Sequence, residues 1–90
     1  MFKILLITTE GCAGCSIMRN SIKQALSLTK KDDIVFEELD VKDIDKKRRN
    51  DLRLKDFPTT IFVKDSIILR KEVGTRPYIV VLRWIDVDFK

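Results

Sequence analysis

The sequence predicts an α/β fold with a four-stranded mixed sheet flanked by helices, in the order β-α-β-α-β-β-α. In the first half of the chain, apolar β-branched runs flank an amphipathic segment, which is typical of parallel strands joined by a helix. In the second half, two β-rich runs lie three residues apart, which favours an antiparallel hairpin. The length of 90 residues suits one hydrophobic core, so residues 1–90 are expected to form a single domain.

A buried strand and a helix begin the chain. Residues Phe2–Thr8 are mainly apolar, and Glu10-Gly11 follows them as a turn. From Ala13 onward, apolar residues recur every three or four positions, which predicts an amphipathic helix ending near residues 28–31. The side chains expected to face the core are Ile17, Met18, Ile22, Ala25 and Leu26.

The second strand and the second helix differ in how much they can bury. Residues Ile34–Val41 form a β-rich run after a turn, and a right-handed crossover makes this strand parallel to the first. Asp43 is then expected to cap a helix that continues through Lys55. Segment 45–51 is so polar that the helix should lie on the surface. Its inward side chains are expected to be Ile44, Leu52 and Leu54.

The hairpin and a final helix complete the predicted fold. Strands are expected at Thr59–Val63 and Ile67–Val73. After Gly74, the proline Pro77 suits the first turn of a helix, although the apolar run 79–81 fits a strand equally well by propensity. The expected helix presents Tyr78, Leu82 and Ile85 on one face, and Trp84 is expected in the core.

Charge and hydropathy argue against nucleic-acid and membrane partners. The net charge is +4, but 14 acidic residues are interspersed with the 18 basic ones. The basic run 46–49 is flanked by aspartates and lacks aromatic residues for base stacking, so we interpret it as a solvated helix face. No apolar run approaches the roughly 20 residues of a membrane span. We expect a cytoplasmic monomer.

Cys12-Ala13-Gly14-Cys15 is the motif that carries chemistry. It lies where the first strand turns into the first helix, so unpaired backbone N–H groups of the helix surround the thiols and favour a thiolate. Cys12, at the outer end, is the expected nucleophile, and Cys15, one turn later, is the expected resolving thiol. Ala13 and Gly14 are small, which we expect to leave room for a substrate chain.

Two other interpretations of the cysteine pair remain open. The pair could form a structural or regulatory disulfide, or it could bind a metal. Zinc sites normally have four Cys or His ligands, whereas this chain has two cysteines and no histidine. We therefore expect no metal and no organic cofactor.

The strand–CxxC–helix opening and Phe57-Pro58-Thr59 at the start of the third strand make the chain resemble the thioredoxin/glutaredoxin superfamily. The resemblance implies a thioredoxin-like fold, with Pro58 in the cis form against the cysteine sulfurs. It also implies that the backbone of Phe57 pairs with a bound substrate chain. Gly74, after the hairpin, matches the family's glycine that lines the substrate groove. Phe57, Pro58 and Gly74 are thus the expected substrate-binding residues.

Several positions depart from the family pattern. Thioredoxins usually have tryptophan before the first cysteine, where this chain has Gly11, and a buried acid that takes the proton of the resolving thiol, where this chain has Leu6. Proton transfer would then depend on water or Glu10. The Gly74-Thr75-Arg76 turn is a poor match to the glutathione-binding turn of glutaredoxins.

The resemblance therefore implies a thioredoxin-like protein-disulfide oxidoreductase that cycles between a Cys12–Cys15 disulfide and a dithiol. Its partners would be disulfide-containing proteins and an electron donor of the thioredoxin reductase type. Two alternatives are a non-catalytic binding module that keeps the fold, and glutathione-linked exchange of the glutaredoxin type.

Overall fold

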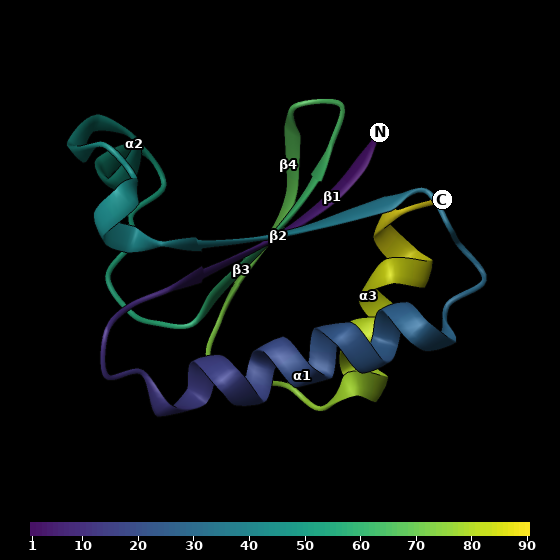
Figure 1. Cartoon of the computed structure of the whole chain (residues 1–90). Coiled ribbons are helices and arrows are strands. Elements are labelled where there is room, and N and C mark those ends of the chain that lie inside the picture. The colour runs from purple at the N-terminus through teal and green to yellow at the C-terminus, as the bar shows by residue number, and fades with distance from the viewer.

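A four-stranded mixed sheet forms the centre of the molecule. The structure is a computed structural model that describes residues 1–90. The strands are β1 (Phe2–Thr8), β2 (Ile34–Asp40), β3 (Thr59–Lys64) and β4 (Ile67–Val73), in the order β2-β1-β3-β4 (Figure 1). Strand β1 is parallel to β2 and antiparallel to β3, and β4 is antiparallel to β3. The predicted mixed sheet is confirmed.

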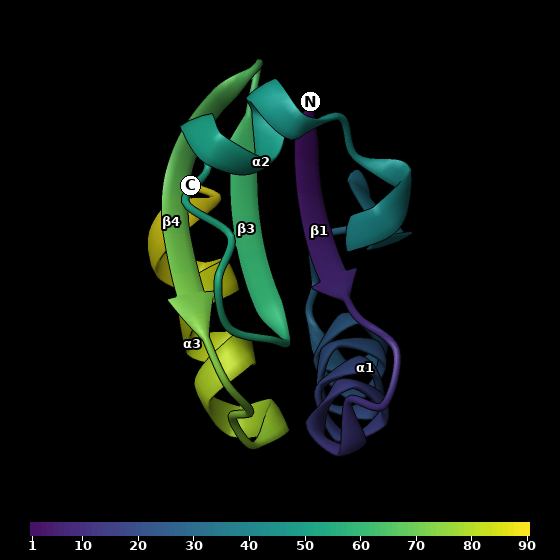
Figure 2. The ribbon, with the colours of Figure 1, turned by 90° about the vertical axis from the view of Figure 1, so that its left-hand side faces the viewer.

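Helices cover both faces of the sheet. They are α1 (Ala13–Leu28), α2 (Lys46–Asp51) and α3 (Tyr78–Asp88), and a 3₁₀ turn, η1 (Val41–Asp43), precedes α2. Figure 2 shows α2 in front of the sheet and α3 behind it, and α3 packs beside α1 on that rear face. None of these helices has the length and apolar character that a membrane span requires.

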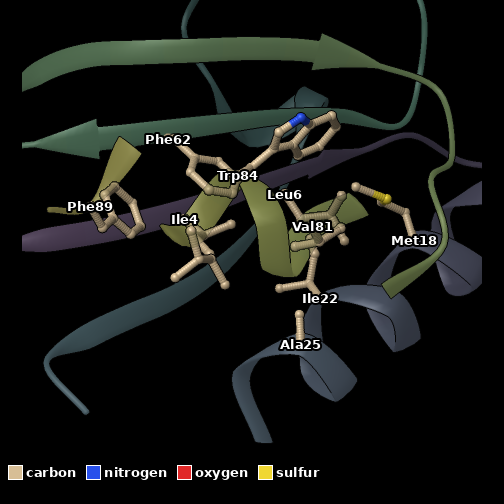
Figure 3. Close-up of a cluster of buried hydrophobic side chains, with 10 residues drawn as sticks. Ile4, Leu6, Met18, Ile22, Ala25, Phe62, Val81, Trp84 and Phe89 are labelled. Carbon is tan, nitrogen blue, oxygen red and sulfur yellow. The ribbon is translucent and has the colours of Figure 1, made fainter. Parts of the chain in front are cut away.

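The main core lies between the sheet and the α1/α3 layer. Its ten buried residues are Ile4, Leu6, Met18, Ile22, Ala25, Phe62, Val81, Trp84, Ile85 and Phe89 (Figure 3). Phe62 is its aromatic centre, because its ring stacks 5.0 Å from that of Phe89 and meets Trp84 edge-on at 6.0 Å. The prediction that Trp84 belongs to the core is confirmed.

The opposite face has a thinner apolar layer. Its buried residues are Ile7, Ile44 and Ile61. Helix α2 is too short to cover the rest of this face, and an open groove of about 410 Å³ remains between α2 and the sheet, with Leu5, Val63 and Ile68 among its lining. The two layers therefore contribute unequally to the core.

The predicted second helix was wrong in its start and its length. Asp45, not Asp43, caps α2, since its carboxylate accepts a hydrogen bond from the Arg48 N–H at 2.8 Å. Asp43 ends the 3₁₀ turn, and α2 stops at Asp51, four residues before the predicted end. Residues 46–51 are all polar, so no apolar stripe extends the helix over the sheet.

Parts of the two predicted packing faces were also wrong. Ile17 is 57% exposed. The buried positions of α1 are Cys15, Met18, Ile22 and Ala25. On α3 the buried positions are Val81, Trp84 and Ile85. The predicted Leu82 is half-buried and packs against the core, and Tyr78 is half-buried. Spacings of three and four fit neighbouring stripes of an apolar helix equally well, and here contact with Phe62 selects the stripe that contains Trp84.

Both chain ends lie away from the start of α1 (Figure 1). The N-terminal ammonium group forms an ion pair with Asp65, in the turn between β3 and β4. Asp65 and Ser66 both have positive φ, 50° and 69°, which suits a two-residue hairpin turn that follows the right-handed twist of the strands.

Candidate redox site

The two cysteines are joined at the N-terminus of α1. Their Sγ atoms are 2.17 Å apart in a disulfide, and their Cα atoms are separated by 5.4 Å. Cys12 is the N-cap residue of α1, and its carbonyl accepts a hydrogen bond from the Cys15 N–H at 3.3 Å. Gly11, with a φ of +73°, provides the left-handed turn that leads from β1 into this helix.

The two sulfurs differ in their access to solvent. Cys15 is 4% exposed, while Cys12 is only partly buried. No acidic residue occupies the first turn of α1, so its free N–H groups and the positive end of the helix dipole act on the cysteines unopposed. Cys12 is therefore the more exposed of the two cysteine residues.

The proline loop lies directly against the motif. The Phe57–Pro58 peptide bond is cis, as the resemblance implied, and Pro58 is buried. A Cβ atom placed on Gly14 would lie 3.4 Å from the Cδ atom of Pro58. The loop between α2 and β3 therefore forms one wall beside the disulfide.

The turn after β4 forms a second wall. Gly74 has a φ of +93°, and its N–H donates a 2.8 Å hydrogen bond to the carbonyl of Pro58. The Thr75 Cγ2 atom lies 3.0 Å from where a Cβ on Gly14 would be. Figure 2 shows the β1–α1 and β4–α3 connections at the same end of the molecule. Three segments far apart in the sequence thus meet around Gly14.

Solved structures with this architecture include thioredoxins. A malarial protein aligns with a TM-score of 0.81 and 14% identity, over 100% of this chain and 99% of its own. Thioredoxin-2, a component of the malaria parasite protein secretion machinery, aligns with a TM-score of 0.81 and 15% identity, over 97% of this chain and 82% of its own. The short form of spinach chloroplast thioredoxin f aligns with a TM-score of 0.78 and 20% identity, over 99% of this chain and 77% of its own.

The chain has the thioredoxin fold. No protein-family model and no curated protein sequence matches it. The likeness is therefore one of structure, and at sequence identities of 14–20% it shows the fold alone.

In this thioredoxin fold the charged side chains lie outside the buried interior. The buried residues of the chain include no Asp, Glu, Lys or Arg. Arg76 follows the Gly74 turn, and its Nη1 donates to the carbonyls of Val73, at 3.2 Å, and Thr75, at 2.9 Å. This side chain therefore holds the turn in place and is not free to bind a ligand with that nitrogen. No group of three or more His, Cys, Asp or Glu side chains is placed to hold a metal ion.

The expectation that the small residues Ala13 and Gly14 leave room for a substrate chain stays a prediction. One contact of the motif was missed, since Thr75 lies beside Gly14. Nothing in the local sequence signals this contact, because it joins residues 61 positions apart through the fold. The structure does bring together all the predicted site residues, namely Cys12, Cys15, Pro58 with its neighbour Phe57, and Gly74.

Proposed function

We propose that the chain is a thiol-disulfide oxidoreductase that reduces or exchanges disulfides of other proteins. The observation that carries this proposal is the Cys12–Cys15 disulfide at a helix N-terminus, with its outer sulfur accessible and cis-Pro58 against the motif. Helix N-termini lower the pKa of a cysteine thiol below its usual value, so reduced Cys12 would be a reactive thiolate near neutral pH.

The reaction has two exchange steps. The Cys12 thiolate attacks one sulfur of the substrate disulfide, a mixed disulfide forms, and the other substrate sulfur leaves as a thiolate that takes a proton from water. The Cys15 thiol then loses its proton to water, and its thiolate attacks the Cys12 sulfur. The Cys12–Cys15 bond forms, the bond to the substrate breaks, and two electrons have passed from the dithiol to the substrate.

Phe57, Pro58 and Gly74 have the proposed role of positioning the substrate. An extended peptide beside Cys12 would lie along the backbone of Phe57, with the Pro58 ring below it and the Gly74 turn as the far wall. The hydrogen bond between Gly74 and Pro58 keeps the two walls at a constant separation.

A protein reductase is the proposed electron donor. One structurally similar chain, 22% identical with a TM-score of 0.78, comes from a complex of ferredoxin:thioredoxin reductase with thioredoxin f2. That complex supports a donor of the reductase class for this fold. We further propose that the protein works as a monomer in the cytoplasm, with no organic cofactor.

Reduction of insulin by dithiothreitol, followed by the turbidity of the released B chain, tests this function. The wild-type protein should accelerate the reaction, and Cys12→Ser should lower it to the rate of dithiothreitol alone. Cys15→Ser should accumulate a mixed disulfide, because the resolving thiol is missing. Wild-type activity equal to that of Cys12→Ser would contradict the proposal.

Two further measurements separate the alternatives. A non-catalytic binding module, an alternative that the departures at Gly11 and Leu6 leave open, would keep its biological activity in Cys12→Ser and lose it when Phe57 or Gly74 is replaced. Glutathione-linked exchange would instead show turnover with glutathione as the sole reductant.

A further inference from the structure

A fully buried hydroxyl without a hydrogen-bonding partner lies two residues beyond Pro58. Thr60 has 0% exposure, and its Oγ1 forms no hydrogen bond within the protein. The neighbouring Thr59 is equally buried, but its hydroxyl donates to the Asp56 carbonyl at 2.7 Å. Buried polar groups are normally paired, since an unpaired one is destabilising. The unpaired Thr60 hydroxyl therefore needs an explanation.

The strand register places this hydroxyl on the face of the sheet that α1 covers. Thr60 lies opposite Leu6, a member of the core between the sheet and α1. The same transverse row continues to Glu38 on β2 and to Glu72 on β4. Because residues directly opposite in neighbouring strands share a face, all four side chains project toward the α1/α3 layer.

Two contacts of α1 bring Cys15 to this row. On the N-terminal side of Cys15, Gly14 lies against Pro58, two residues before Thr60. On its C-terminal side, Arg19 donates through Nε and Nη2 to the two carboxylate oxygens of Glu38, at the β2 end of the row. Cys15 lies between these contacts along α1 and is itself buried, on the same stripe of the helix as Met18, which belongs to the core that includes Leu6.

The ionisable groups around this row are already engaged or lie outside the interior. Glu38 is held by Arg19, and the two carboxylate oxygens of Glu72 are held by Arg70 and Arg76. From β1 the row contributes the apolar Leu6, and Glu10, beyond the end of that strand, is exposed. Helix α3 adds Tyr78, half-buried in its first turn.

We propose that the Thr60 hydroxyl donates a hydrogen bond to the Cys15 sulfur once the disulfide opens, and so stabilises the thiolate that carries out the resolving step. This inference rests on the proposed function. A disulfide sulfur is a poor acceptor, whereas a thiolate is a strong one, so the hydroxyl gains its partner only in the reduced protein. Thr60 keeps its proton throughout, and the proton of the Cys15 thiol passes to water.

The decisive variant is Thr60→Val, which removes the hydroxyl and keeps the shape of the side chain. In the reduced protein we expect the pKa of the Cys15 thiol, followed by its Cβ chemical shift, to rise by about one unit, because a hydrogen bond to the charged form lowers a pKa. Resolution of a preformed mixed disulfide between Cys12 and glutathione, followed by rapid mixing, should become about threefold slower near neutral pH, because a tenfold smaller thiolate fraction is partly offset by a more nucleophilic thiolate.

Two matched variants serve as controls. Thr60→Ser keeps a hydroxyl and should retain both values, and Thr59→Val, which removes the paired hydroxyl on the opposite face, should leave both unchanged. An unaltered pKa and an unaltered resolving rate in Thr60→Val would overturn the proposal. The pKa measurement needs no substrate, so it decides the role of Thr60 even if the wild-type protein fails to reduce insulin and the proposed function is wrong.

Discussion

Gly14 is confined on two sides within the Cys12–Cys15 motif. Thr75 Cγ2 and Pro58 Cδ would be 3.0 Å and 3.4 Å from a Cβ at this position. Ala13, one residue earlier, is exposed. The two positions between the cysteines therefore have different structural requirements, and Gly14 lies against the β4–α3 turn.

We predict that Gly14→Ala destabilises the protein by about 1 kcal/mol, because the new methyl group overpacks the contact with Thr75. In a Thr75→Ala background the same change should become neutral or stabilising, since alanine favours a helix over glycine by up to about 1 kcal/mol. Urea unfolding of the four proteins in a double-mutant cycle measures the coupling. Ala13→Ser, at the exposed position, is the control, and additive effects at Gly14 and Thr75 would contradict the prediction.

At the scale of the elements, an ion pair joins the β3–β4 hairpin to the N-terminal residue of the chain. The Asp65 carboxylate accepts a hydrogen bond from the N-terminal ammonium group, and this contact lowers the pKa of Asp65 below its ordinary value of 3.8. The carboxylate is fully exposed, so the interaction is weakened by salt.

Because the pKa of Asp65 is lowered in the folded protein, its contribution to the free energy of unfolding depends on pH. The contribution is present above pH 3.8, the ordinary value, and is lost as the pH falls through the lower pKa of the folded state. Asp65→Asn should therefore lose a small amount of stability at pH 6 and very little at pH 2. Thermal unfolding at both pH values checks this, and high salt should reduce the pH 6 difference. An equal loss at both pH values would indicate a turn effect without electrostatic origin.

The accuracy of the sequence-based prediction varied from element to element for physical reasons. Strands β1 and β4 have their predicted bounds, because turn residues border both β-rich runs and mark their ends. Helix α2 carried no such signal, since polar residues fill segment 46–51 and a single side-chain cap at Asp45 sets its start. In α3 the apolar residues are too numerous for spacing alone to select the packing face.

In the candidate site, too, some features could be predicted from the sequence and others could not. Cys12 and Cys15 could be found from their spacing and their place at a strand-to-helix turn, and the cis form of Pro58 followed from the family resemblance. The contact of Gly14 with Thr75 and the unpaired hydroxyl of Thr60 could not be predicted. Both depend on how separate segments pack, and neither leaves a local pattern in the sequence.

At the scale of the whole molecule, the two faces of the sheet differ in their share of the core. Ten buried residues fill the α1/α3 side, whereas three lie beneath α2 beside an open groove. Ile22 and Ile44 are a matched pair for comparing the two layers, since they have the same side chain and are 0% and 8% exposed.

We predict that Ile22→Ala costs more stability than Ile44→Ala. Both fall within the range of about 2–5 kcal/mol known for buried isoleucine, but the cavity left by Ile22 is enclosed on all sides while that left by Ile44 adjoins the groove. Urea unfolding of the oxidised proteins provides the two free energies. Equal losses would show that the α2 layer packs as tightly as the other.

Both ends of the chain lie on the side of the molecule remote from the start of α1, which Cys12 caps (Figures 1 and 2). A fluorescent label, an affinity tag or a linker to a solid support joined at either end would therefore project away from the reactive sulfur. Immobilised protein should keep Cys12 free to capture partners, so a resin carrying the Cys15→Ser variant would suit the isolation of covalently trapped substrates.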